Sequence, residues 1–187
     1  MTDKMINGIL FILAGLGSLV IYILLGETGL LGKAHTEKIA AYALITIPLA
    51  FMMTRNVEKN AFIKVQTYID AGLLMMVVGL SMGLASDAIH SAELSAESES
   101  IASAIAWTGW SIMYFGIFIT GIGYLRTNLF PQWLSGLVSV ASFAMFAFLI
   151  ILNGEQLSNN EDMVGPLWMI NSLVMVILGI FTIRRAE

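Results

Sequence analysis

Two histidines and several carboxylates are the residues of this chain that could bind a metal ion. Asp87, His90 and Glu93 follow one another at i, i+3 and i+6, and His35 lies in an earlier segment. Imidazole and carboxylate groups are common metal ligands, and two histidines from consecutive helices could also bracket a haem. The competing interpretation is that these groups lie at a membrane surface, where they are solvated or hydrogen-bonded to nearby backbone. We favour this second interpretation and expect neither a metal nor another cofactor.

Asp70 and Arg126 are the charged residues for which we expect a structural role. Asp70 follows Lys64 by six positions, which at about 1.5 Å per helical residue places its carboxylate roughly 9 Å inside a membrane span. An ionisable side chain at such a depth is costly unless it is paired. Arg126 ends the next span on the same side of the membrane. The sequence therefore predicts an Asp70–Arg126 ion pair, with a substrate or ion contact at Asp70 as the alternative.

Three aromatic side chains share one face of the fourth apolar segment. Trp107, Trp110 and Tyr114 have the spacing i, i+3 and i+7, and the polar Asn171 lies in the last segment. Together these residues could line an outward cavity for a lipid or a quinone-like molecule. Anchoring of the tryptophans at the membrane–water interface explains them equally well. Both interpretations remain open from the sequence.

Other kinds of chemistry are excluded by residue type. The chain has no cysteine, which rules out disulfides, thiolate metal sites and cysteine nucleophiles. No phosphate-binding loop, zinc-protease motif or serine-hydrolase elbow occurs. The middle of every apolar segment lacks charged residues and histidine, which argues against an ordinary proton-coupled transporter. With a net charge of −4 and 9 basic residues, the chain has no electrostatic footprint for nucleic acid.

The composition identifies the elements that must position these residues. Hydrophobic residues make up 58% of the 187 positions and charged residues 12%, and the mean hydropathy is +0.84. A soluble domain is about 45–50% apolar and about 25% charged. A chain of this size cannot hide so much apolar surface from water as one ordinary globule. The sequence therefore predicts an integral membrane protein.

Six apolar segments approach the length of about 20 residues that a membrane-spanning helix needs. The second is the weakest, because it is short and Pro48 in its middle should bend the helix. The sequence predicts an all-α, six-span transmembrane bundle that forms a single domain over residues 1–187. The predicted spans are 6–26, 38–54, 65–89, 101–125, 131–153 and 163–183.

The basic residues predict how the bundle is oriented. Lys and Arg near span ends accumulate on the cytoplasmic side of a membrane. If both termini are cytoplasmic, Lys33 and Lys38 are the two basic residues on the outside, and the other seven are cytoplasmic. The opposite orientation would invert this distribution. We therefore expect both termini in the cytoplasm, in what we take to be a prokaryotic cytoplasmic membrane.

Small residues recur every seven positions on four of the spans. A period of seven keeps them on one face of supercoiled helices, where small side chains let the backbones approach closely. The glycines to which we assign helix packing are Gly72, Gly79, Gly109, Gly116, Gly123, Gly165 and Gly179. We expect tight packing within the bundle, with a homo- or hetero-oligomeric contact through one such face as the alternative.

The fourth and fifth segments are joined by the run GYLRTNLFPQWLSGL, which contains Arg126, Pro131 and Trp133. This connection resembles that of uncharacterised prokaryotic multi-span membrane proteins of the domain-of-unknown-function class. The last segment, LWMINSLVMVILGIFTIRR, resembles their closing helix. The resemblance implies a bundle of six or seven spans and brings no activity or catalytic residue with it.

Three functions are compatible with these observations. The first is a non-enzymatic accessory or scaffold subunit that packs against membrane partners, because midplane chemistry is lacking and small-residue faces are abundant. The second is a permease-like protein that binds a small molecule or lipid near Trp107, Trp110 and Tyr114. The third is a metal- or haem-containing membrane enzyme that uses His35 and His90. We favour the first, with the lipid bilayer as the one certain partner and an enzyme as the less favoured class.

Overall fold

The computed structural model describes residues 1–25, 32–92, 95–152, 156 and 161–185, and within these ranges it is all-helical. The 3₁₀ helix η1 joins the second long helix to the third. The elements are α1 (Asp3–Leu25), α2 (Gly32–Val57), η1 (Lys59–Phe62), α3 (Gln66–His90), α4 (Ala96–Leu125), α5 (Gln132–Ile151) and α7 (Glu161–Arg184). Each predicted span overlaps one long helix, so the predicted all-α class is confirmed.

Two helices extend well beyond their predicted spans. Helix α2 begins at Gly32 and continues through Pro48 to Val57, although the proline has no N–H to donate to the carbonyl one turn earlier. Helix α4 begins at Ala96, because the side chain of Ser95 accepts a hydrogen bond from the backbone N–H of Ser98 and caps the helix. The acidic stretch that follows Ser95 therefore forms the first turn of α4, where negative charge suits the helix dipole.

Four of the described helical segments are long and apolar enough to cross a membrane. They are α3, α4, α5 and residues Val164–Arg184 of α7. Large apolar side chains also cover the outside of these helices, and Leu74, Val140 and Ile150 are 66%, 69% and 61% exposed. Such surfaces are unfavourable in water and match a lipid environment. These properties indicate an integral membrane protein.

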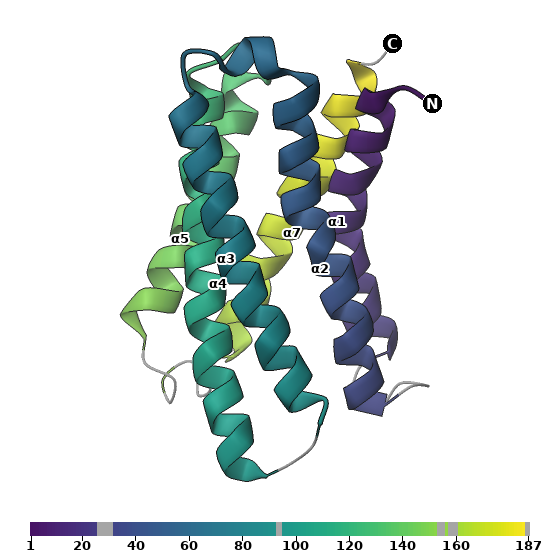
Figure 1. The fold of residues 1–187 in the computed structure, drawn as a ribbon, viewed down its shortest axis with the longest axis vertical. Helices are drawn as coiled ribbons and strands as arrows, with labels where there is room; N and C mark the ends of the chain where they lie inside the picture. Colours follow the sequence, from purple (N-terminus) through teal and green to yellow (C-terminus); the bar gives the residue numbers. More distant parts are fainter. Residues whose placement is uncertain (26–31, 93–94, 153–155, 157–160, 186–187) are drawn as a thin grey trace.

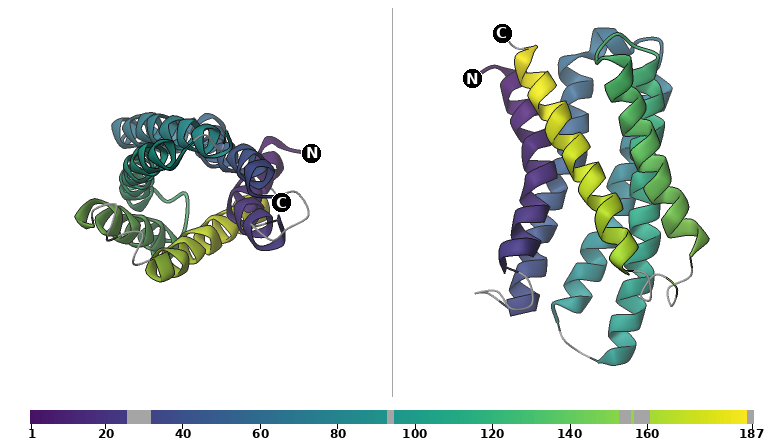
Figure 2. Two further views of the ribbon diagram at one scale, coloured as in Figure 1. Left: turned by 90° about the horizontal axis from the view of Figure 1, so that it is seen from below. Right: turned by 180° about the vertical axis from the view of Figure 1, so that it is seen from behind.

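The long helices form a ring that follows the order of the chain, as the end-on view of Figure 2 shows. Each helix packs against its predecessor and its successor, and α7 closes the ring against α1. Both termini lie at the same end of the bundle (Figure 1), together with η1 and the connection between α4 and α5. We call this the termini end, and the end with the connection between α3 and α4 the opposite end.

The most intimate helix contacts are made by glycine. Gly72 and Gly79 of α3 lie against Gly116 and Gly109 of α4. A Cβ atom on Gly116 would lie 2.6 Å from the carbonyl oxygen of Gly72, and one on Gly109 would lie 2.7 Å from that of Gly79. Because real Cβ atoms do not approach so closely, larger residues would push the two helices apart. Gly123 packs against Ile69 in the same interface.

Helices α1 and α7 also pack closely through small residues. Gly8 of α1 lies against Gly179 of α7, with each position too close to the other's carbonyl oxygen for a side chain, and Gly15 lies against Ser172. Gly165 differs from the other glycines in the predicted packing set, because no atom lies within 4 Å of the place where its Cβ would be. Apart from Gly165, the glycines of the predicted packing set therefore make their contacts within the chain.

Candidate functional site

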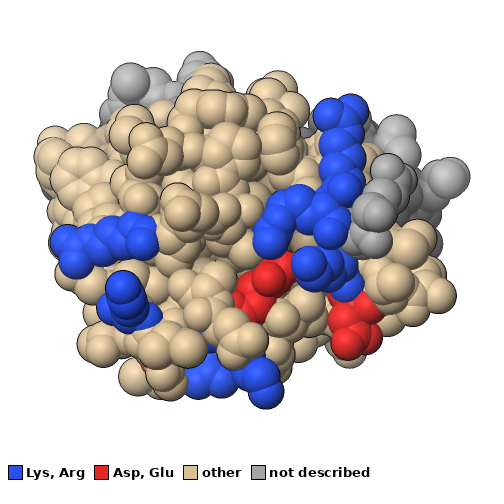
Figure 3. Space-filling model, turned by 90° about the horizontal axis from the view of Figure 1, so that it is seen from above, with Lys and Arg blue, Asp and Glu red and all other residues tan. Residues whose placement is uncertain are grey.

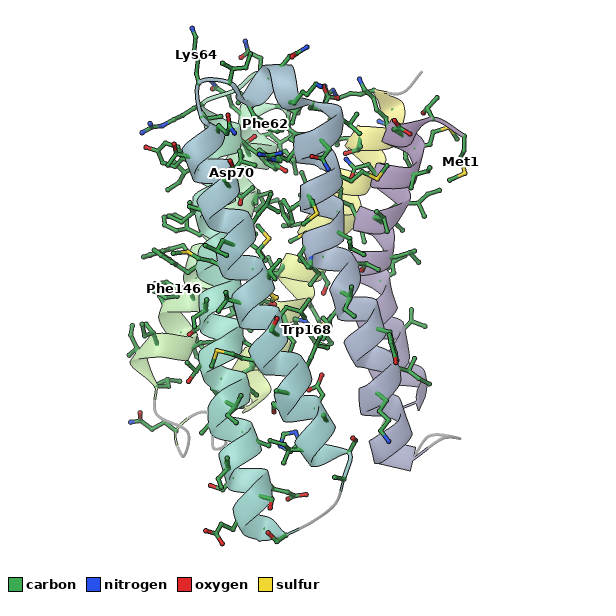
Figure 4. The ribbon with its side chains drawn as sticks, in the orientation of Figure 1. Met1, Phe62, Lys64, Asp70, Phe146 and Trp168 are labelled. Carbon is green, nitrogen blue, oxygen red and sulfur yellow. The ribbon has the colours of Figure 1, made fainter. Side chains whose placement is uncertain are left out.

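A cavity of about 440 Å³ lies inside the ring. The part of its wall from α5 belongs to the last two turns of that helix, and the part from α7 to its first two turns. The cavity therefore lies toward the opposite end of the bundle, and Figure 4 shows Trp168 in the interior between the helices. Its lining residues are Leu44, Trp107, Trp110, Met113, Tyr114, Met145, Leu149, Val164, Gly165 and Trp168.

The structure brings the three aromatic residues of the fourth predicted span to this cavity. Trp107, Trp110 and Tyr114 line it from α4, and Trp168 of α7 adds a third indole from across the ring. Trp110 also packs over Gly83 of α3, where a Cβ atom would lie 3.1 Å from the indole ring. Sequence reasoning did not select Trp168, because its segment has no second aromatic at helical spacing to mark a common face.

Asn171 lies beside the cavity rather than in its wall, which corrects the expected position of this residue. It borders a neighbouring void of about 10 Å³ that also touches Tyr114 and Trp168. Its amide nitrogen donates to the carbonyl oxygens of Leu167 and Ala141 at 2.9 and 3.2 Å, and its side-chain oxygen lies 3.5 Å from the Ser142 hydroxyl. Asn171 therefore ties α7 to α5, since its hydrogen-bonding groups are already used by the protein.

The chemistry of the cavity is apolar and aromatic. None of the lining residues that the structure describes is charged. The side chain of Tyr114 is only 5% exposed, and it adds a hydroxyl group to this otherwise apolar lining. A phenol hydroxyl can donate a hydrogen bond to a molecule that occupies the cavity.

Aromatic rings fill the interior between the cavity and the termini end. The ring of Tyr124 stacks on Phe51 and Phe62 at centroid distances of 6.1 and 5.7 Å, and Phe130 lies 5.2 Å from it. Phe11 meets Phe51 edge-on at 5.1 Å. We call these five residues the aromatic layer. All five are at most 3% exposed, so the layer closes the interior on this side.

Ion pairs join the helices beyond the aromatic layer. Glu58 follows α2, and its Oε1 atom lies 3.1 Å from Lys4 Nζ and 3.1 Å from Arg185 Nη2. Lys4 belongs to α1, and Arg185 follows α7, so one carboxylate connects three elements. The Arg185 guanidinium also lies over the ring of Phe130 at 5.6 Å. The termini end is therefore closed by rings on the inside and by ion pairs on the outside.

Asp70 pairs with a different arginine from the one predicted. Arg55 of α2 donates two hydrogen bonds to its carboxylate, and Gln66 donates a third at 3.1 Å. Arg126 instead lies over the ring of Tyr68, 4.7 Å from its centroid. The expected Asp70–Arg126 pair is therefore corrected to Asp70–Arg55. Asp70 lies in the part of α3 nearer the termini end (Figure 4), and it lines neither the cavity nor the neighbouring void.

The structure describes only part of the predicted metal site. Asp87 is buried in α3, and His90 Nε2 lies 3.5 Å from the Ser103 hydroxyl. Among the described residues, no group of three His, Cys, Asp or Glu side chains could hold a metal ion. The side chain of His35 and the whole of Glu93 lie outside the described part. The metal and haem hypotheses therefore stay predictions where these two residues are concerned.

No family model, curated protein or solved structure matches the chain in comparisons with known proteins. The resemblance of the fourth to sixth predicted spans to a multi-span family stays a prediction. The cavity and the layers that close one end of it are therefore the features that bear on function.

Proposed function

We propose that this protein is a six-span membrane protein that binds an uncharged, largely apolar small molecule of quinone type in the cavity at Trp107, Trp110 and Tyr114. The observation that carries this proposal is a cavity lined by three indole rings, with the side chain of Tyr114 in the same wall. Ligand cavities usually measure about 300–1,000 Å³ and combine apolar walls with a few polar groups. The cavity of about 440 Å³ agrees with both properties.

The uncharged lining favours an uncharged ligand. An anion would find no basic side chain in the described wall, and a cation would find no carboxylate. Moving an uncompensated charge into such a site costs far more than moving a neutral molecule. A planar ring can stack on the indoles of Trp107, Trp110 and Trp168, and a carbonyl oxygen on that ring can accept the Tyr114 hydrogen bond. These features together describe a quinone-like head group.

The basic residues support an orientation with the cavity facing outward. Figure 3 looks onto the termini end, where Lys and Arg side chains lie around the face. They come from η1 and from the ends of the long helices, at Lys4, Arg55, Lys59, Lys64, Arg126, Arg184 and Arg185. By the positive-inside rule this end is cytoplasmic. The cavity then opens toward the other side of the membrane, which we take to be a prokaryotic cytoplasmic membrane.

Binding is tested by titrating the purified protein with duroquinone, a neutral planar quinone, and recording tryptophan fluorescence. The Trp133→Phe variant serves as the parent, because Trp133 is 57% exposed and lies outside the cavity, so that the three remaining tryptophans all line it. We expect saturable quenching. Tyr114→Phe should weaken binding about 3- to 10-fold, which is the range of one hydrogen bond.

Tyr42→Phe is the matched control, because Tyr42 is 75% exposed and does not line the cavity. Its affinity for duroquinone should equal that of the parent. Tetraphenylphosphonium, an apolar cation, should bind at least about tenfold more weakly than duroquinone because the wall has no counter-charge. Absence of saturable quenching, or equal affinities in the Tyr114→Phe variant and the parent, would overturn the proposal.

The accessory or scaffold function has lost one of its two supporting arguments. It relied on the abundance of small-residue faces, and the described glycines on those faces of α1, α3, α4 and α7, apart from Gly165, pack against one another inside the chain. The shortage of charged groups at membrane depth is equally compatible with a site for a neutral ligand. We therefore place ligand binding ahead of this alternative.

A further inference from the structure

The long helices that the structure describes form two halves of three helices each: α1, α2 and α3 in the first half, and α4, α5 and α7 in the second. Within each half, the first helix packs on the second and the second on the third. The third helix of each half packs on the first helix of the other half, so that α3 meets α4 and α7 meets α1. Because three is an odd number, α4 starts from the end opposite to the one where α1 starts (Figure 1). The two halves therefore have inverted topology.

Two of the contacts that join the halves lie at corresponding positions. Gly79 of α3 packs on Gly109 of α4, and Ser172 of α7 packs on Gly15 of α1. Gly15 precedes Gly109 by 94 positions, and Gly79 precedes Ser172 by 93 positions. The two interfaces thus use equivalent places in the two halves.

The same correspondence returns one heptad further along. The Ser86 hydroxyl of α3 donates to the carbonyl oxygen of Ala102 at 2.8 Å, and Gly179 of α7 packs on Gly8 of α1. Gly8 precedes Ala102 by 94 positions, and Ser86 precedes Gly179 by 93. All four stripes have the same spacing of seven residues, so the second pair follows from the first. The correspondence ends at the next heptad, where Gly72 packs on Gly116 but no atom lies within 4 Å of the place where a Cβ atom of Gly165 would be. The shared helix order and these contacts support an internal repeat with inverted topology.

One face of α2 runs along the axis of the ring from the cavity to the termini end. Leu44 lines the cavity, Ile47 borders the small void, and Phe51 belongs to the aromatic layer. Thr54 comes next, with its hydroxyl 2.8 Å from the amide of Asn7, and Glu58 ends the series. The steps of three and four residues keep the first four on one face of α2, and Glu58 follows directly after the helix.

Helix α7 presents a matching face on the other side of the axis. Trp168 lines the cavity, and Met175 borders the small void. Leu178 and Thr182 are buried further along, and Arg185 reaches Glu58. The interior of the ring therefore contains a cavity toward the opposite end and is filled by side chains toward the termini end.

We infer that the protein transports its ligand by alternating access, with the aromatic layer and the Glu58–Arg185 ion pair as the gate on the termini side. The inference depends on the proposed ligand binding for its cargo. Transporters built from inverted repeats hold substrate at the interface of the repeats and open alternately to the two sides, because each half can adopt the arrangement of the other. The cavity here lies at that interface, since α2 contributes to its wall from one half and α4, α5 and α7 from the other.

Contacts between the two halves should break when the gate opens, whereas contacts within one half can persist. Phe51–Tyr124 and Glu58–Arg185 join one half to the other, so they separate when the gate opens. Lys4–Glu58 lies within the first half, so it can persist. The gate is thus a set of contacts between halves, and loosening it should expose the buried layer that contains Thr54.

The experiment uses single-cysteine variants, because the natural chain contains no cysteine. Thr54→Cys places a thiol in a residue that is 1% exposed, between the aromatic layer and Glu58. An impermeant maleimide is applied to the membrane face from which Asn60→Cys in η1 reacts. We expect slow but measurable labelling of Thr54→Cys from that face. The added change Glu58→Gln should accelerate it about 3- to 10-fold, because it weakens the ion pair between halves.

Two controls accompany this measurement. Glu97→Gln removes an exposed carboxylate at the opposite end and should leave the labelling rate unchanged. Thr182→Cys, 4% exposed on the facing side of α7, provides a second reporter should Thr54→Cys fail to fold. If folded reporters of both kinds stay unreactive with Glu58→Gln while Asn60→Cys reacts, the gate does not open and the inference is overturned.

The failure of this inference can be distinguished from failure of the proposed binding, because the labelling needs no ligand. Saturable quenching by duroquinone together with unreactive reporters would leave a binding protein and overturn transport. Reactive reporters that accelerate with Glu58→Gln would support the gate even if duroquinone does not bind.

Discussion

The Asp70 carboxylate on α3 accepts two hydrogen bonds from the Arg55 guanidinium on α2, at 2.8 Å from Nε and 3.3 Å from Nη2. This two-point contact bridges α2 and α3 near the termini end. The side chains are 37% and 42% exposed, so solvent screens the pair. Its geometry nevertheless favours it over a single-point contact.

The Asp70–Arg55 pair predicts a specific pattern of energetic coupling. Asp70→Asn and Arg55→Gln should each lower the free energy of unfolding in detergent, and the double variant should lose less than the sum of the two losses. Asp70→Asn combined with Arg126→Gln should be additive, because Arg126 lies over Tyr68 instead. Thermal unfolding of these four variants and of Arg126→Gln alone tests this. Coupling of Asp70 to Arg126 in place of Arg55 would contradict the observed pairing.

The glycine contacts predict a large effect of a small substitution. Gly116→Ala adds a Cβ atom 2.6 Å from the carbonyl oxygen of Gly72, and separating α3 from α4 should cost about 1–3 kcal/mol of stability. Gly136→Ala is the control, since the nearest atom to its new Cβ is 4.0 Å away, and it should be neutral or slightly stabilising. Unfolding in detergent measures both. A stable Gly116→Ala protein that loses an oligomer would instead assign this face to a partner.

The proposed orientation predicts which surface residues face the cell exterior. Ser100 is exposed at the opposite end of the bundle, and Asn60 is exposed in η1 at the termini end. In intact cells an impermeant thiol reagent should label Ser100→Cys and spare Asn60→Cys until the membrane is permeabilised. The reverse labelling pattern would show that the protein has the opposite orientation, with the cavity toward the cytoplasmic side.

The cavity predicts that tryptophan weakens ligand binding at one position of α5 and has no effect on binding at the next position. Leu149→Trp fills space at the cavity wall and should weaken duroquinone binding at least about tenfold. Ile150→Trp changes a residue that is 61% exposed on the outside of α5 and should leave binding unchanged. Equal affinities of the two variants, measured by direct binding of radiolabelled quinone, would show that the ligand occupies another site.

The helices themselves were predictable from the sequence, because the length and apolarity of each segment depend on local composition alone. The shared face of Trp107, Trp110 and Tyr114 was predictable for a similar reason, since the helical period determines which side chains lie together. The early start of α4 had a local signal too, because Ser95 caps a helix whose first turn is acidic.

The partners of these side chains depend on tertiary structure. Arg55 and Arg126 end helices that both neighbour α3, so depth in the membrane could not decide which of them meets Asp70. The glycines at a spacing of seven predicted close helix contacts. Only the folded ring shows that these contacts are made within the chain. The aromatic layer draws Phe51, Phe62 and Tyr124 from three separate elements, and no local pattern links residues that far apart. Which side chains meet in the site therefore depends on how the helices are rotated and packed in the ring. A single helix does not determine this, because it fixes only the directions of its own side chains.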